Sequence, residues 1–250
     1  MSNIYKGILD SVKQGSKTFA VLVDPDKSSL EEVKELSFSA QACGVDYILV
    51  GSSILTNGSM ERCIEAIKEF CNIPVLLFPG NTLQVNPLAD GILYLSLISG
   101  RNPDMLIGNH VISAPLVKAS DLEVIPTGYM LVESGSVTTV SYMSNTIPIP
   151  RGKKEIAACT AMAGEMLGLK LMYLEAGSGA GQMVPPKMIQ AVKESIGIPL
   201  IVGGGIRSAE MAEACCKAGA DIIVVGNAFE KDLSLMESMC RTVHDVVSVS

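Results

Sequence analysis

The alternation of short apolar runs with helix-patterned segments constrains the fold of this chain more than any other feature. The runs are continuous, as in TFAVLVD and ADIIVVGN, which is typical of parallel strands that are buried on both faces. We expect strands at 18–24, 45–51, 73–80, 91–97, 123–134, 169–176, 198–205 and 220–227. About eight strand–helix units predict an α/β fold, a single TIM (β/α)₈ barrel over residues 1–250.

One strand–helix unit of this predicted barrel is irregular. Only NTLQVNPLAD, residues 81–90, separates the third strand from the fourth. This connection is too short for a crossover helix with its loops. We therefore expect the third helix to be missing or replaced by an extended segment, which would thin the outer wall beside strands three and four.

The composition excludes several classes of protein. The net charge of −7 and the absence of tryptophan argue against a nucleic-acid binder, which needs a basic face or stacking platforms. Mean hydropathy is high, at +0.37, but no stretch of about 18 uncharged apolar residues would span a membrane. The N-terminal segment predicts an amphipathic helix, not a signal peptide. The seven cysteines have no CxxC spacing and indicate reduced thiols in a cytoplasmic protein.

Glycine and polar clusters follow five of the predicted strands at their carboxyl ends. These clusters are VDPDK after the first strand, VGSS after the second, and YLEAGSGAG, VGGGIRS and VVGNA after the last three. In a TIM barrel the carboxyl ends of the strands form one rim, and active sites lie there. The sequence therefore predicts one site that is built from these segments.

The glycines after the last strands predict a phosphate-binding site. Gly203, Gly204 and Gly205 allow backbone N–H groups to approach an anion closely. Gly226 and Asn227 precede the predicted final helix, whose N-terminus attracts phosphate. Phosphate sites after strands seven and eight are common in TIM barrels. The alternative is that these glycines only relieve crowding in tight turns, but the GSG after the sixth strand favours phosphate.

Two carboxylates at the rim are candidates for chemistry. Glu175 ends the sixth strand, where it can accept a proton from a substrate hydroxyl or hold that hydroxyl; the alternative is a structural acid paired with Lys or Arg. Asp24 ends the first strand, and with an oxygen from Ser53 it suits Mg²⁺, which uses few protein oxygens alongside substrate phosphates. The alternative for Asp24 is a turn or cap role, and Asp26 is a candidate cap for the next helix.

Two anionic sites on one rim predict two substrates. A monophosphate would lie against strands six to eight, and a diphosphate would lie with Mg²⁺ at strands one and two. The loop at 134–154 is long and rich in hydroxyl groups, and it follows the fifth strand at the same rim. Long loops of this kind are typical of lids, although a simple insertion is the alternative.

Six motifs, FAVLVDPDK, GSSILTNG, FPGN, YLEAGSGA, GGGIRS and VVGNAFE, follow one another over essentially the full chain. In this order they resemble the geranylgeranylglyceryl phosphate synthase family, which also includes bacterial heptaprenylglyceryl phosphate synthases. The resemblance implies a Mg²⁺-dependent prenyltransferase of phospholipid biosynthesis. Its members join the C3 hydroxyl of sn-glycerol 1-phosphate to a polyprenyl diphosphate, here geranylgeranyl, and release diphosphate. The resemblance also implies a homo-oligomer.

The resemblance assigns roles residue by residue. Asp24 and Ser53 match the family's metal site, and Glu175 matches the acid near the glycerol hydroxyl. The residues that match the glycerol phosphate site are Tyr173, Leu174, Glu175, Ala176, Gly177, Ser178, Gly179, Gly204, Gly205, Gly226 and Asn227. Two positions depart from the heptaprenyl type, which has a lysine at the position of Leu22 and a tyrosine at the position of Ala176. Both departures favour the geranylgeranyl-type branch.

A prenyl chain requires an apolar groove, which we expect along strands three to five where the wall is thin. Candidate lining residues are Tyr94, Leu97, Tyr129 and Met130, although each is also typical of an ordinary core. The apolar product suggests transient contact with a membrane surface.

Other functions fit part of the sequence. A different phosphosugar barrel enzyme, such as an isomerase or a relative of indole-glycerol phosphate synthase, would not explain the metal-linked site on strands one and two. A Schiff-base aldolase needs a rim lysine, but Lys170 begins the sixth strand and only Lys27 lies near the rim. A silent barrel that serves as a binding or assembly subunit is disfavoured by the acid, the metal ligand and the glycines.

Overall fold

A closed barrel of eight parallel strands in chain order forms the centre of the molecule, in a computed structural model that describes residues 3–247. The strands are β1 (Thr18–Val23), β2 (Tyr47–Val50), β3 (Val75–Leu77), β4 (Gly91–Leu97), β5 (Glu123–Leu131), β6 (Leu171–Glu175), β7 (Leu200–Gly203) and β8 (Ile222–Val225). Ala20 of β1 lies opposite both Tyr47 of β2 and Val224 of β8, which closes the barrel. The predicted TIM barrel is confirmed.

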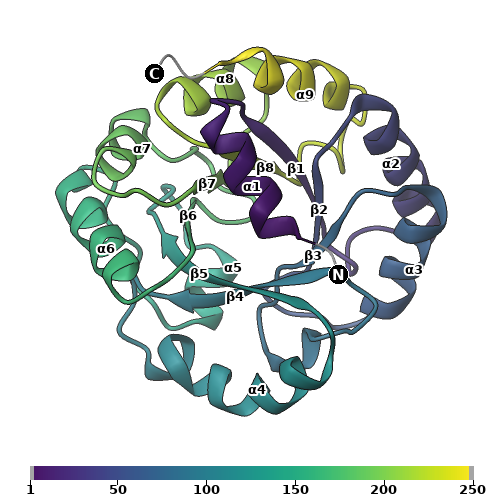
Figure 1. Cartoon of the computed structure of the whole chain (residues 1–250), viewed down its shortest axis with the longest axis horizontal. Helices are drawn as coiled ribbons and strands as arrows, with labels where there is room; N and C mark the ends of the chain where they lie inside the picture. The colour runs from purple at the N-terminus through teal and green to yellow at the C-terminus, as the bar shows by residue number, and fades with distance from the viewer. Residues whose placement is uncertain (1–2, 248–250) are drawn as a thin grey trace.

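Helices surround the strands in a ring (Figure 1). Those that follow strands are α2 (Leu30–Cys43), α3 (Met60–Phe70), α4 (Asn109–Ala119), α6 (Lys154–Met166), α7 (Pro186–Lys193), α8 (Ala209–Lys217) and α9 (Leu235–Asp245). Ser29 and Glu32 form a capping box that starts α2, and Gly44, with a φ of 75°, ends it. Within residues 3–247 no helix combines the length and the apolar character that crossing a membrane would require.

The connection between β3 and β4 contains no full helix. A single 3₁₀ turn, η1 (Thr82–Gln84), stands where the third helix of a regular barrel would lie. The Asn81 side chain accepts the N–H of Leu83 and so favours this tight turn over an α-helix. The expectation of a missing third helix is therefore confirmed, and the outer wall is thin beside these two strands.

The 134–154 segment contains a short helix, α5 (Thr139–Met143), which its loop-like composition did not predict. Thr138 and Ser141 form a reciprocal capping box that starts this helix. A π-helical turn, η2 (Asp104–Gly108), also precedes α4. Both short elements lie on the carboxyl side of the barrel strands, beside the thin part of the wall.

Helix α1 (Ile4–Lys13) closes the amino end of the barrel, and Figure 1 shows it crossing the strands at their centre. Ile4 and Ile8 are buried in the same cluster as the inward-facing strand residues. The N–H groups of Ile4 and Tyr5 donate to the Glu123 carboxylate, at 2.6 and 2.9 Å, which satisfies the free end of this helix. With this end sealed, the carboxyl rim is the open face of the barrel.

Candidate active site

A cavity of about 470 Å³ opens at the carboxyl ends of β1, β2, β6, β7 and β8, and we call it the main cavity. Most of the sequence-predicted site residues line it, although they come from distant parts of the chain. They are Asp24, Ser53, Tyr173, Glu175, Ser178, Gly179, Gly204, Gly205, Gly226 and Asn227. The structure therefore brings both carboxylates and most of the glycine segments into one place.

Three predicted glycerol phosphate residues are not part of the cavity wall. Leu174 and Ala176 alternate with Tyr173 and Glu175 along β6, so their side chains point away from the barrel interior and pack in the layer under the helices. Gly177 donates its N–H to Oε1 of Glu175 at 2.6 Å instead of lining the cavity. The structure thus does not bring the Leu174 and Ala176 side chains to the site, and the Gly177 backbone N–H holds the Glu175 carboxylate.

Glu175 is a buried acid, with a side chain that is only 5% exposed. Burial raises the pKa of its carboxyl to about 7, while the hydrogen bond from the Gly177 N–H acts in the opposite direction. Among residues 3–247 no lysine or arginine pairs with it. An acid in this state exchanges protons near neutral pH, which is typical of a general base and not of a structural ion pair.

Three aromatic rings enclose this acid from the barrel side. Tyr173 stacks on Phe78 with centroids 5.3 Å apart, and Tyr129 meets Tyr173 edge-on at 5.5 Å. The Tyr173 hydroxyl has no hydrogen-bond partner within the described part of the chain. Burial raises the pKa of both tyrosines well above its usual value. These rings are part of the surroundings whose burial of Glu175 raises the pKa of its carboxyl. Phe78 was missed by sequence reasoning, because an aromatic after a buried strand is a weak signal.

Gly204 and Gly205 follow β7 in left-handed backbone conformations, with φ of 80° and 72°. A Cβ at position 204 would collide with Oε1 of Glu175 and would lie 2.8 Å from the Ala176 nitrogen. These glycines therefore let the β6 and β7 loops approach each other around the acid. At this position, relief of crowding, which the sequence offered as an alternative, is compatible with a role in shaping the site.

The hydrogen-bond donors that could bind a phosphate are already paired with the side-chain oxygen of Asn227. The Ser178 hydroxyl and the Gly179 N–H both donate to Oδ1 of Asn227, at 3.0 and 3.2 Å, and the Asn227 amide donates to Glu230 at 2.9 Å. We call Ser178, Gly179 and Asn227 the anion cradle. Oδ1 of Asn227 stands in for an anion oxygen, so the donors are arranged for such a group.

Asp24 faces the main cavity from the end of β1, and Ser53 lies on the neighbouring loop after β2. Oδ1 of Asp24 accepts the N–H of Asp26 at 3.1 Å, and Oδ2 pairs with the Lys27 ammonium at 3.1 Å. Within residues 3–247 no group of three or more His, Cys, Asp or Glu side chains could hold a metal ion. A carboxylate and a hydroxyl do fit Mg²⁺ that takes its other ligands from substrate and water. The ammonium beside Oδ2 shows that this carboxylate accepts a cation.

Asp26 does not cap the next helix, and that expectation is wrong because Ser29 takes the position. The Asp26 carboxylate instead accepts hydrogen bonds from the Thr56 N–H and hydroxyl, at 2.6 and 2.9 Å, and from the N–H groups of Asn57 and Gly58. Slight burial acts to raise the pKa of Asp26, but these hydrogen bonds together lower it to about 2. Asp26 therefore ties the β1 loop to the loop that carries the predicted metal ligand after β2.

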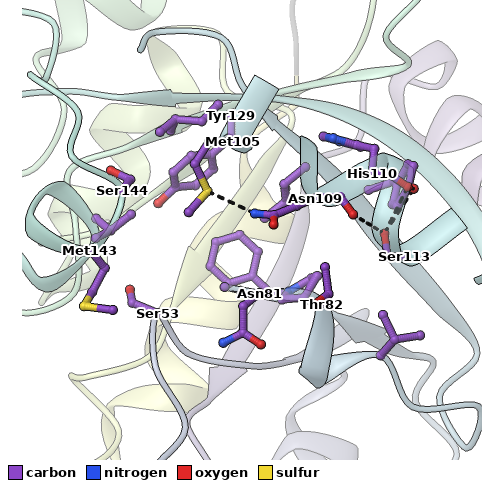
Figure 2. A pocket seen from close by; sticks show the side chains of 18 of the residues that line it. Ser53, Asn81, Thr82, Met105, Asn109, His110, Ser113, Tyr129, Met143 and Ser144 are labelled. Carbon is purple, nitrogen blue, oxygen red and sulfur yellow. Dashed lines mark hydrogen bonds between the residues drawn. The ribbon is translucent and has the colours of Figure 1, made fainter. Parts of the chain in front are cut away.

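A second, mostly apolar cavity of about 110 Å³ adjoins the main cavity, and we call it the side cavity. It lies where the third helix is missing, and Figure 2 shows Met105, Asn109 and His110 on one side and Met143 and Ser144 on another. Of the four groove residues suggested by the sequence, Tyr94, Leu97 and Tyr129 line it. Met130 does not, because it points outward from β5 into the layer under the helices.

Two further features bear on the site. Val140 of α5 lines both cavities, so the 134–154 segment lies over their junction; its role as a lid stays a prediction. Arg207 also lines the main cavity and donates to the Ala180 carbonyl, which fixes the end of the β6 loop. Sequence reasoning missed Arg207, although it directly follows the GGGI motif.

Comparison with known proteins gives a consistent result. The model of the PcrB family matches residues 12–247. A geranylgeranylglyceryl phosphate synthase from Chitinophaga pinensis is 52% identical over 248 residues, covering 99% of this chain and 98% of that protein. One from Thermococcus kodakarensis is 48% identical, covering 86% and 85%. The crystal structure of (S)-3-O-geranylgeranylglyceryl phosphate synthase from Thermoplasma acidophilum with its substrate sn-glycerol-1-phosphate superposes with a TM-score of 0.93 at 32% identity, covering 98% and 100%.

Proposed function

The chain belongs to the PcrB family, and from this premise we propose how its rim performs prenyl transfer. The reaction joins the C3 hydroxyl of sn-glycerol 1-phosphate to a polyprenyl diphosphate, geranylgeranyl in the named relatives, and releases diphosphate. One observation carries the proposal: the buried acid Glu175 lines the same cavity as the anion cradle and Asp24. A proton acceptor, a phosphate site and a cation-binding carboxylate thus share one cavity.

The anion cradle would hold the phosphate of sn-glycerol 1-phosphate. The Gly179 N–H and the Ser178 hydroxyl now donate to Asn227, and they would donate to a phosphate oxygen instead. Gly204 and Gly205 add backbone that is free of side chains on the opposite side. A phosphate at this position would leave the glycerol hydroxyls near the end of β6, where Glu175 lies.

Glu175 would take the proton from the C3 hydroxyl as the oxygen attacks the prenyl C1 carbon. A pKa of about 7 leaves a useful fraction of the carboxylate ionised at neutral pH while keeping it a strong enough base. The Gly177 N–H fixes one carboxylate oxygen at 2.6 Å and so orients the other. The aromatic enclosure of Phe78, Tyr129 and Tyr173 keeps bulk water from competing for the prenyl group.

Asp24 and Ser53 would hold Mg²⁺, which when bound neutralises the charge of the departing diphosphate. The side cavity would receive the first part of the prenyl chain, since it is apolar and meets the main cavity at Phe78 and Tyr129. These two placements set C1 of the prenyl group between the diphosphate and the glycerol hydroxyl. The contribution of the barrel to the rate is then largely this alignment.

The surroundings of the enzyme belong to the same proposal. Exposed apolar side chains gather around η2 and α4, namely Ile107, Val111, Ile112 and Leu116. They lie beside the side cavity and support transient contact with a membrane surface from which an apolar substrate could be taken. A cytoplasmic location and a homo-oligomer are further proposals, which follow from free cysteine thiols and from family membership.

A product assay tests this function. Purified protein would be incubated with Mg²⁺, radiolabelled sn-glycerol 1-phosphate and prenyl diphosphates of increasing length, with sn-glycerol 3-phosphate as the control. Label that moves into butanol only with the 1-phosphate supports prenyl transfer. Binding of glycerol phosphate with no product at any prenyl length would leave a phosphate-binding barrel of different chemistry.

A further inference from the structure

Lys27 occupies the space between the predicted metal site and the anion cradle. It ends the tight turn Asp24–Lys27, in which its N–H donates to the Asp24 carbonyl at 3.0 Å. This turn directs the side chain across the mouth of the main cavity, where it is about 41% exposed.

The Lys27 ammonium contacts a group from each side of the cavity. It lies 3.1 Å from Oδ2 of Asp24, 3.1 Å from the Ser178 hydroxyl and 3.9 Å from Oε1 of Glu230. Asp24 belongs to the predicted metal site, whereas Ser178 belongs to the anion cradle. Glu230 accepts a hydrogen bond from Asn227 of that cradle. One flexible cation therefore joins the two substrate sites in the ligand-free protein.

Ligand binding would change the surroundings of this ammonium on both sides of the cavity. A phosphate in the cradle would place a dianion beside Ser178, within reach of the same ammonium. A divalent cation on Asp24 would take the carboxylate oxygen that the ammonium now holds. Lys27 cannot stay on Oδ2 of Asp24 while a second cation binds there, because like charges at such a distance repel.

We propose that Lys27 exchanges Asp24 for the phosphate of sn-glycerol 1-phosphate, and that this exchange makes phosphate binding and divalent-cation binding cooperative. The phosphate draws the ammonium away from Asp24, which frees the carboxylate for the cation. By linkage, the bound cation repels the ammonium toward the phosphate by the same free energy. This inference rests on the proposed function, and it adds a positional role for one residue that links the two sites.

The size of the effect follows from the exposure of the ion pair. A half-exposed Lys–Asp pair stabilises the ligand-free state enough to weaken cation binding by about two- to fivefold. Removing the ammonium should therefore tighten cation binding to the ligand-free protein by about that factor. The same change should reduce the tightening that glycerol phosphate produces by a similar factor, since only the direct attraction between phosphate and cation remains.

The test measures metal binding without turnover. Free Mn²⁺, which binds oxygen ligands as Mg²⁺ does, would be titrated and followed by electron paramagnetic resonance, with and without saturating sn-glycerol 1-phosphate. The proteins are the wild type, Lys27→Met, Lys27→Arg and Lys231→Met. Lys231 lines the same cavity and makes no ion pair within residues 3–247, so its loss changes the local charge without touching Asp24. Circular dichroism would confirm that each variant is folded.

We expect K27M to bind Mn²⁺ about two- to fivefold tighter than the wild type in the absence of glycerol phosphate, while K27R and K231M stay close to the wild type. Cation binding by K27M that is unchanged or weaker, or an equal effect of K231M, would overturn the proposal. A wild type that binds no Mn²⁺ under either condition would remove the metal site and this proposal together. The product assay in the presence of Mg²⁺ would then show separately whether prenyl transfer itself stands.

Discussion

Replacing Glu175 by glutamine should remove activity and at the same time stabilise the protein. The glutamine keeps the size of the side chain and an oxygen that can accept the Gly177 N–H, but it cannot take a proton from a hydroxyl. Loss of a general base typically lowers kcat by about 10²–10⁴-fold. A retained activity within tenfold of the wild type would refute the assigned role.

The stability of the same variant should depend on pH in a defined direction. Burial raises the pKa of Glu175 from its ordinary value of 4.5 to about 7. Below pH 4.5 the group is protonated in both the folded and the unfolded chain, so it contributes no penalty. Between pH 4.5 and 7 the unfolded chain ionises first, and the free energy of unfolding falls by about 1.4 kcal/mol per pH unit. Above pH 7 the full penalty applies, up to about 3 kcal/mol.

The E175Q variant escapes this penalty, so its advantage over the wild type should grow from pH 4.5 to pH 7 and then level off. For a chain of this size, about 3 kcal/mol corresponds to a rise in Tm on the order of 6–12 °C. Scanning calorimetry of both proteins at pH 4.5 and pH 8 would measure it, with Glu133→Gln on the exposed surface as the control. A variant E175Q that is no more stable than the wild type at pH 8, or that has the same advantage at both pH values, would contradict the raised pKa of Glu175.

Three further perturbations have expected outcomes. Asp24→Asn should lower kcat about 100-fold or more and should weaken Mn²⁺ binding in the resonance titration; unaltered metal binding would place the cation elsewhere. Gly204→Ala should lower the free energy of unfolding by about 1–3 kcal/mol more than the control Gly135→Ala. Both glycines have a positive φ, but only position 204 is crowded, by Glu175. Equal losses of unfolding free energy in urea titrations would contradict this. His244 Nε2 donates a hydrogen bond to the Asp46 carboxylate at 2.8 Å, which raises the pKa of His244 to about 10, so this stabilisation is complete below pH 6.5 and is lost as pH rises to 10. His244→Ala should therefore reduce Tm at pH 6 and change it little above pH 10, and the reverse order would be evidence against the pair.

The fold could be predicted because the strands are buried on both faces. The run GILYLSL was predicted as a strand at 91–97, and these are the bounds of β4. Runs of this kind lack the regular spacing of polar residues that would indicate a helix or a half-exposed strand. The short 81–90 connection likewise excluded a helix on length alone. The short helix α5 could not be predicted, because it depends on the Thr138–Ser141 capping box instead of on a periodic apolar face. The π-helical form of η2 could not be predicted either, because no side-chain cap marks where this turn begins.

The site could be predicted at the level of strand ends and not at the level of individual contacts. Glu175 and Asp24 were identified because parallel strands place their carboxyl ends on one rim. Leu174 and Ala176 were included with them as part of a contiguous motif, although the two-residue period of β6 directs their side chains to the other face. Asp26 was misassigned as a cap, because its partners Thr56, Asn57 and Gly58 are thirty residues away along the chain. Contacts of that kind follow only from the closed barrel.

In the proposed reaction, Glu175 is the base for a hydroxyl that is bound beside the anion cradle. The most direct test is the pH dependence of kcat for prenyl transfer, with both substrates saturating so that titration of the free substrates does not contribute. We expect kcat to fall about tenfold per pH unit below a pKa of about 7 or slightly higher, since the bound phosphate further disfavours the carboxylate. In E175Q this dependence should disappear along with most of the rate. A kcat that stays constant from pH 5 to pH 8 in the wild type would contradict the claim.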